Sequence, residues 1–104
     1  MSYKKIEKKH IVITAIDEDD NNSSLTILQI IRNIRNRNII AKLVYGGSIK
    51  KKLSKNLDAT AIIIVEKQLL EYKSVRIKNI PLYKEDIVQI EQCEEFLLKN
   101  IFDN

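Results

Sequence analysis

The stretch from Ala61 to Ile80, AIIIVEKQLLEYKSVRIKNI, decides the fold of this chain. It begins with a continuous apolar run, which is typical of a strand buried on both faces. A polar turn rich in Glu, Lys and Gln follows, and any ligand is expected there. Val75 and Ile77 then alternate with Arg76 and Lys78, which predicts a half-exposed strand. Because the turn is short, we expect the two strands to form an antiparallel hairpin.

Two strand–helix units precede this stretch. The segment His10–Ile16, HIVITAI, is short, apolar and β-branched, as expected of a central strand. Apolar residues then recur at helical spacing and predict an amphipathic helix of about three to four turns. Its predicted inward stripe comprises Leu25, Ile27, Leu28, Ile30, Ile31 and Ile34. The segment Ile39–Tyr45 predicts a second strand, and Ile49–Leu57 predicts a short basic helix.

The rest of the chain predicts three strands and a closing helix. Thr60–Val65 is the third strand, Pro81 ends the fourth, and Tyr83–Ile90 holds the fifth. Glu91–Ile101 predicts a helix whose inward residues are Cys93, Phe96, Leu97 and Ile101. The order βαβαβββα predicts an α/β domain over residues 10–104, with a mixed five-stranded sheet flanked by three helices. Residues 1–9 are expected to be a flexible N-terminal stub.

Composition limits the classes of protein. The 104 residues suffice for one small domain, and a net charge of +4 gives a mild bias toward polyanions. A single cysteine excludes an intramolecular disulfide and fits a reducing compartment. No apolar run approaches the roughly 18–20 residues of a membrane span, and the N-terminus MSYKKIEKKH lacks the apolar core of a signal peptide. The cytoplasm is therefore the expected compartment.

An acidic run, DEDD at 17–20, lies between a strand and a helix. Clustered carboxylates there can hold Mg²⁺, as in response-regulator receiver domains. A receiver also needs a phospho-accepting aspartate after its third strand, where this chain has Val65-Glu66. Acidic residues also complement the dipole at a helix N-terminus, and we favour that interpretation. No metal site is predicted.

A glycine turn, Gly46-Gly47-Ser48, precedes the basic helix. Its backbone N–H groups can cradle a phosphate, although it is neither a GxGxxG nor a Walker motif. A tight turn with a helix cap is the favoured interpretation. Lys51, Lys52 and Lys55 are expected to share one exposed face, which would favour phosphate contact. His10 is expected to be a polar residue at a strand start, and Cys93 a small core residue.

Five polar residues around the predicted hairpin form the best candidate site: Glu66, Lys67, Gln68, Arg76 and Lys78. Gln and Glu side chains present acceptors and donors to base edges, while Arg and Lys reach bases or phosphates. Strand alternation points Arg76 and Lys78 to the same face. An ordinary solvated hairpin explains the same residue types equally well, so residue types alone leave both interpretations open.

The hairpin and the order of elements resemble the anticodon-binding domain of class IIa aminoacyl-tRNA synthetases, most of all the C-terminal domain of histidyl-tRNA synthetase. In that family the third strand runs into Gly-Glu-x-Glu-Leu, a short turn, and Lys-Val-x-Leu-Lys-Asp-Leu. The matching run here is IIIVEKQLLEYKSVRIKNI. Glu66 matches the first glutamate, Leu69 the leucine and Lys73 the lysine.

The resemblance covers about residues 9–101 and extends to the second helix. The run SIKKKLSKNLDA at 48–59 is similar to that family's Lys- and Leu-rich helix and the Ala-Asp-Lys-x-Gly-Ala phrase after it. The departures are Val65 and Asp58 near expected glycines, Gln68 for the second glutamate, and Ser74 as a one-residue insertion. Gln for Glu keeps hydrogen bonding but removes a charge, so the base preference is not carried over.

The resemblance implies a tRNA anticodon-loop binding module that has no catalytic residues and no cofactor, because the family's active site belongs to a separate domain. The implied tRNA-binding residues are Tyr45, Ser48, Lys51, Lys52, Glu66, Gln68, Arg76 and Lys78. Tyr45 and Tyr72 can stack a base. The expected partners are an anticodon stem-loop and a synthetase catalytic domain in cis or in trans, and the isolated chain is expected to be a monomer. The alternative is a protein-interaction or regulatory domain that kept the fold and lost RNA binding.

Overall fold

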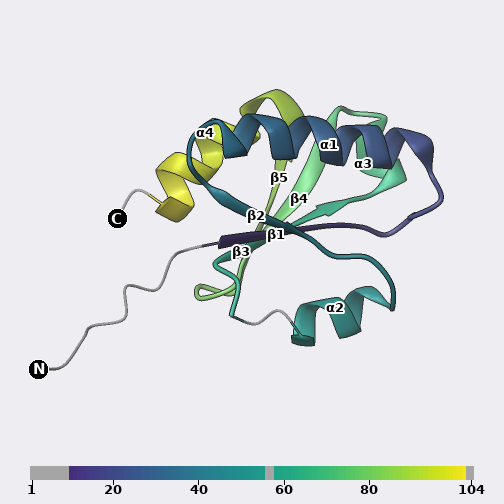
Figure 1. Ribbon diagram of the computed structural model, residues 1–104, viewed down its shortest axis with the longest axis horizontal. Helices are drawn as coiled ribbons and strands as arrows, with labels where there is room; N and C mark the ends of the chain where they lie inside the picture. Colours follow the sequence, from purple (N-terminus) through teal and green to yellow (C-terminus); the bar gives the residue numbers. More distant parts are fainter. Residues whose placement is uncertain (1–9, 56–57, 103–104) are drawn as a thin grey trace, which may run out of the picture.

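The computed structural model describes residues 10–55 and 58–102, which form one α/β domain (Figure 1). The expected stub over residues 1–9 and the predicted helix end at Leu57 lie outside the described residues. The elements in chain order are β1 (His10–Ala15), α1 (Asn21–Arg35), β2 (Ile40–Leu43), α2 (Ile49–Lys55), β3 (Ala61–Val65), α3 (Lys67–Leu70), β4 (Ser74–Asn79), β5 (Lys84–Gln89) and α4 (Cys93–Leu97). A 3₁₀ turn (Ile90–Gln92) precedes α4, and a π-helical turn (Leu98–Phe102) extends it.

The five strands form one sheet in the order β2-β1-β3-β4-β5. The central strand β1 is parallel to both neighbours, with Ile11 opposite Ala41 on one side and Ala61 on the other. The β3–β4 and β4–β5 pairs are antiparallel. The predicted mixed five-stranded sheet is thus confirmed, including the change from parallel to antiparallel pairing within Ala61–Ile80.

Helices cover the two faces of the sheet unequally. Figure 1 shows α1, α3 and α4 on one face and α2 alone on the other. The larger core lies under α1 and α4 and takes Ile11, Ile13 and Ile63 from the sheet. A smaller cluster of Val12, Ala59, Ile62 and Ile64 lies on the α2 side, with Leu53 packed against it. Alternating side chains of β1 and β3 therefore enter different cores, which explains their unbroken apolar sequences.

The half of the α2 face made by β4 and β5 is open. Residues opposite one another in an antiparallel pair share a face. Arg76 lies opposite Ile64 and Lys78 opposite Ile62, so both point to the α2 side. On the same face, Ile87 of β5 lies opposite Arg76 and is 59% exposed. The face is therefore apolar and covered over β1 and β3, and polar and solvated over β4 and β5.

Three details differ from the predicted elements. The polar turn after β3 contains the one-turn helix α3. The strand β2 ends at Leu43, two residues before its predicted end, although the Val44 backbone N–H still donates to the Ile13 carbonyl of β1 at 3.0 Å. Leu25 and Leu28 are exposed rather than inward. The buried stripe of α1 consists of Ser23, Ile27, Ile30, Ile31 and Ile34. In the described part of the chain, no helix is long and apolar enough to cross a membrane.

Candidate nucleic-acid interface

A buried lysine joins the loops at the carboxyl ends of the parallel strands. Lys52 Nζ donates to Glu18 Oε2 at 2.7 Å and to the Ala15 carbonyl at 3.1 Å. The same Glu18 oxygen accepts a hydrogen bond from the Gly46 backbone N–H at 2.7 Å. The Lys52 side chain is 4% exposed. The prediction that Lys52 belongs to an exposed phosphate-binding face is therefore wrong, because its ammonium group points inward to hold the β1–α1 and β2–α2 loops together.

These contacts favour the ionised form of the Glu18 carboxyl group. The hydrogen bond from Lys52 lowers the pKa of the Glu18 carboxyl below its usual value of 4.5, and the Gly46 N–H acts in the same direction. Removal of the surrounding water opposes the shift only in part. Glu18 and Lys52 thus form a charged pair that fastens α2 to the edge of the sheet.

The rest of the acidic run serves local structure. Asp20 caps α1, since its carboxylate accepts from the Ser23 backbone N–H at 3.0 Å and from the Ser23 hydroxyl at 2.8 Å. Asp17 accepts from the Lys67 N–H at 3.4 Å and so contacts the start of α3. Within residues 10–55 and 58–102, no group of three His, Cys, Asp or Glu side chains is arranged to hold a metal ion. These contacts support the helix-terminus interpretation of DEDD.

The glycine turn has the geometry of a turn with a cap. Gly46 and Gly47 have φ angles of 84° and 78°, a region that glycine adopts at little cost. Ser48 Oγ accepts from the Lys51 backbone N–H at 3.2 Å, as a helix cap does. Lys51 itself is exposed. Tyr45, just before the turn, is 52% exposed and available for stacking.

Arg76 is held by two carboxylates. Its Nη2 donates to Glu66 Oε2 at 3.2 Å, and its Nη1 lies 3.2 Å from Glu85 Oε1. These partners raise the pKa of Arg76, with the Glu66 hydrogen bond as the larger cause. The guanidinium group is therefore fixed in orientation on the open half of the sheet. Lys78, on the same face, is partly buried, and its side chain makes no hydrogen bond or ion pair within the described residues.

Most of the predicted RNA-binding residues lie on the α2 side or at the adjoining sheet edge. Arg76 and Lys78 lie on the open half-sheet, while Lys51 and its exposed neighbours Lys50 and Lys55 belong to α2. Lys42 was missed by the sequence analysis. It lies opposite Val12 in a parallel pair, so it shares the α2 face. Its place between inward-facing Ala41 and Leu43 is the alternation signal that would have identified it.

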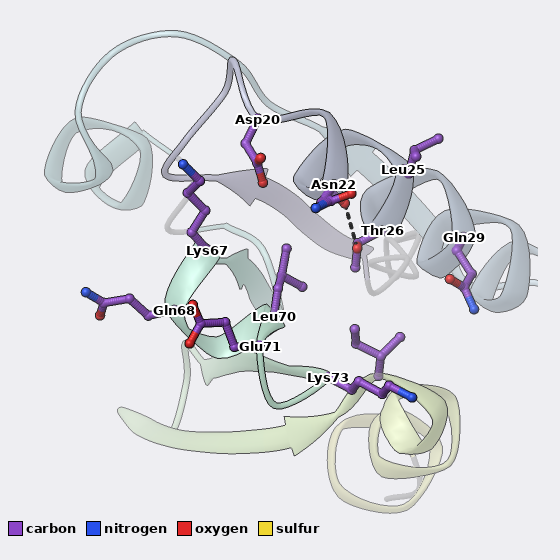
Figure 2. Close-up of a pocket in the computed structure, with 11 residues that line it drawn as sticks. Asp20, Asn22, Leu25, Thr26, Gln29, Lys67, Gln68, Leu70, Glu71 and Lys73 are labelled. Carbon is purple, nitrogen blue, oxygen red and sulfur yellow. Dashed lines mark hydrogen bonds between the residues drawn. The ribbon is translucent and has the colours of Figure 1, made fainter.

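Gln68 does not lie with these residues. It belongs to α3 and lines a groove of about 650 Å³ between α1, α3 and the turn that precedes β4 (Figure 2). We call this the α1–α3 groove; its polar lining includes Asn22, Gln29, Gln68, Lys67 and Lys73. No pattern in the linear sequence connects α1 with the hairpin, because only the sheet order brings these two segments together.

Two other singled-out residues are structural. Cys93 is 2% exposed, and burial raises the pKa of its thiol to about 12, as expected of a core cysteine. His10 Nε2 lies 4.0 Å from Asp58 Oδ2 at the start of β1. No chemical role follows for either residue.

The similarity of this chain to known proteins is a similarity of fold. No protein-family model and no curated protein sequence matches the chain. Among solved structures, this fold is shared with parts of two aminoacyl-tRNA synthetase chains. Prolyl-tRNA synthetase from Cryptosporidium parvum, complexed with L-proline and AMP, matches 94% of this chain with a TM-score of 0.85 and 11% identity. The RNA-binding domain of threonyl-tRNA synthetase from Cryptosporidium parvum Iowa II matches 88% with a TM-score of 0.73 and 10% identity.

The extent of these matches limits what they establish. The chain spans 22% of the prolyl enzyme and 23% of the threonyl chain. At this level of identity the likeness establishes the fold, and it confirms the architecture implied by the resemblance to anticodon-binding domains. The histidyl assignment is a finer statement than these neighbours support.

Proposed function

We propose that this chain is a tRNA anticodon-loop binding module without catalytic activity of its own, and that it is the C-terminal domain of a histidyl-type synthetase or a paralogue derived from one. The observation that carries the proposal is the open half-sheet on the α2 side. There Arg76 and Lys78 face solvent beside a helix that bears exposed lysines. A basic surface next to a polar, uncovered sheet suits an unpaired loop with a charged backbone.

The lysines of α2 and β2 supply the electrostatic part of binding. Lys42, Lys50, Lys51 and Lys55 are all exposed, and none has an ion-pair partner within the described residues. Such cations bind backbone phosphates and release counterions, so the affinity falls with salt. This part of the surface holds the loop without reading its sequence.

Base recognition is assigned to Arg76, Glu66 and Glu85, which we call the Arg76 cluster. With Glu66 and Glu85 beside it, the cluster carries one positive and two negative charges, which is unfavourable for a phosphate. A fixed guanidinium donor next to a carboxylate acceptor instead matches the edge of an unstacked base. Lys78 adds a donor on the same face, and Tyr45 offers an aromatic ring for stacking.

The proposal also includes a larger synthetase to which this module would belong. The solved neighbours are more than four times as long as the part that this chain matches, so ligase activity and a catalytic domain in cis or in trans are proposals about a larger assembly. We expect the module to act in the cytoplasm, as a monomer in isolation.

A binding titration tests the proposed function. The probes are anticodon stem-loops for histidine, proline and threonine tRNAs plus unrelated loops, each at two salt concentrations. Preference for one loop that persists at the higher salt would establish a reading module and identify its tRNA. Weak binding that is equal for all loops and is lost with salt would refute it.

A protein-interaction or regulatory role is the second candidate, and one observation favours it. Two of the cations expected to contact RNA are already engaged within the protein, Lys52 by Glu18 and Arg76 by two glutamates. If the titration shows no loop preference, this role predicts a stable protein partner or a homodimer instead.

A further inference from the structure

The α1–α3 groove lies on the opposite face of the sheet from Arg76, Glu66 and Glu85. Its volume of about 650 Å³ falls within the range of small-molecule sites. In Figure 2, Leu70 points from α3 toward α1 across the middle of the groove. Lys67 and Lys73 bound the α3 side at its two ends. The groove thus has an apolar middle and a cationic side chain at each end.

Three amide side chains line this groove at separate places, and Figure 2 shows Gln68 directed away from α1. Asn22 and Gln29 come from α1, and Gln68 comes from α3. None of the three amide groups makes a hydrogen bond within the described part of the chain. Each offers a carbonyl acceptor beside an NH₂ donor, which is the pairing that matches the edge of a nucleobase.

The groove continues the proposed RNA surface around the end of β3. Glu66 faces the α2 side, where it binds Arg76, and is also the residue that begins α3. The next two residues, Lys67 and Gln68, line the groove. An RNA strand that passes the carboxyl end of β3 therefore meets both surfaces within three consecutive residues.

We propose that the α1–α3 groove accepts one unpaired nucleobase of the bound RNA loop. Its edge would be read by the amide of Gln29, its face would rest on Leu70, and its flanking phosphates would lie near Lys67 and Lys73. This inference rests on the proposed function. Two carboxylates also line the groove, but Asp20 is engaged with Ser23. The exposed Glu71 disfavours a phosphate deep in the groove, which leaves that position to a base.

Photocrosslinking tests the placement. The probe is the tightest-binding stem-loop of the titration, with 4-thiouridine placed singly at each loop position and the products digested with trypsin. We expect one loop position to crosslink to the peptide Gln68–Lys73, which forms part of the groove. Crosslinks confined to peptides of α2 and β4 would overturn the inference while leaving the proposed function intact.

A pair of variants gives a second readout. Gln29→Leu removes one amide from an exposed position and should weaken binding of the same stem-loop about tenfold, with an unchanged salt dependence and melting temperature. Leu28→Gln, at an exposed position of α1 outside the groove, is the control and should bind as the wild type does. Equal affinities for Gln29→Leu and wild type would refute base reading in the groove. Failure of the wild-type chain to prefer any stem-loop would refute both proposals together.

Discussion

Lys52 Nζ lies 2.7 Å from Glu18 Oε2, and this pair joins the beginning of α2 to the loop that follows β1. The lysine side chain is 4% exposed, whereas its neighbour Lys51 is exposed on the same helix. Lys51 and Lys52, adjacent in one basic run, therefore have different roles. One stabilises the fold, and the other is available to a polyanion.

This difference predicts opposite results for matched substitutions. Lys52→Met should lower the free energy of unfolding by about 1–3 kcal/mol, because the Ala15 carbonyl loses its charged donor in a buried site. Lys51→Met should change it by less than about 0.5 kcal/mol. In RNA titrations, Lys51→Met should reduce the salt slope by about one, and Lys52→Met should leave it unchanged. Urea unfolding and salt-dependent binding measure the two effects; equal stability losses would contradict the assignment.

The same pair predicts an acid-sensitive contribution to stability. The pKa of Glu18 is lowered from 4.5 in the folded state, so the unfolded state binds this proton more readily. The contribution is therefore present above pH 4.5 and is lost as the pH falls through the lowered folded-state pKa. The stability difference between wild type and Glu18→Gln should shrink as the pH falls below about 5. Asp19→Asn, in the same loop, is the control; a difference that stays constant with pH would argue against the pair.

Base preference should depend on the open half-sheet and on α3 more than on α2. Lys78→Gln or Gln68→Ala should change the ranking of anticodon stem-loops, because these side chains lie where bases are proposed to bind. Lys51→Gln should weaken all loops by a similar factor, since a phosphate contact carries no sequence information. The full stem-loop panel, measured at one salt concentration, makes this comparison. An unchanged ranking in Lys78→Gln would remove the half-sheet from base recognition.

The Cys93 thiol should resist modification in the folded protein. Burial raises its pKa to about 12, so little reactive thiolate forms near neutral pH, and the side chain is 2% exposed. Labelling with 5,5′-dithiobis(2-nitrobenzoate) at about pH 8 should proceed only as fast as the domain opens, and urea should accelerate it. Immediate labelling of the native protein would show that the terminal helix does not cover this thiol.

Sequence patterns predicted the sheet well because they record burial along single strands. The run AIIIV and the alternation of Val75 and Ile77 with Arg76 and Lys78 correspond to β3 and β4 as found. The buried residues of α1 were harder to predict, because helical spacing does not show how many of the apolar side chains the sheet can cover. Leu25 and Leu28 satisfy the spacing yet are 64% and 58% exposed. Only one face of α1 packs against the sheet, and Leu25 and Leu28 lie beside that face.

The candidate site depended on long-range contacts that a linear pattern does not contain. Strand alternation correctly placed Arg76 and Lys78 on one face. The burial of Lys52 required Glu18, which lies far away in the sequence, and the separation of Gln68 from Arg76 required the turn of α3 after Glu66. Residue types suggested which side chains bind RNA, but the connections between loops decide which of them are available.

The position of β1 has a consequence for the way the chain is synthesised and folds. This strand is translated before its partners, yet Ile11 needs both Ala41 and Ala61 as neighbours. The β4–β5 hairpin, by contrast, pairs segments close together in the sequence. The apolar side chains of β1 must therefore wait on the ribosome until β3 has emerged, whereas the hairpin that carries Arg76 is translated later but can form as soon as its own two strands have emerged. A pause in translation before residue 61 would leave the central strand of the parallel half of the sheet paired on one side only, and that is the stage at which a chaperone would be needed most.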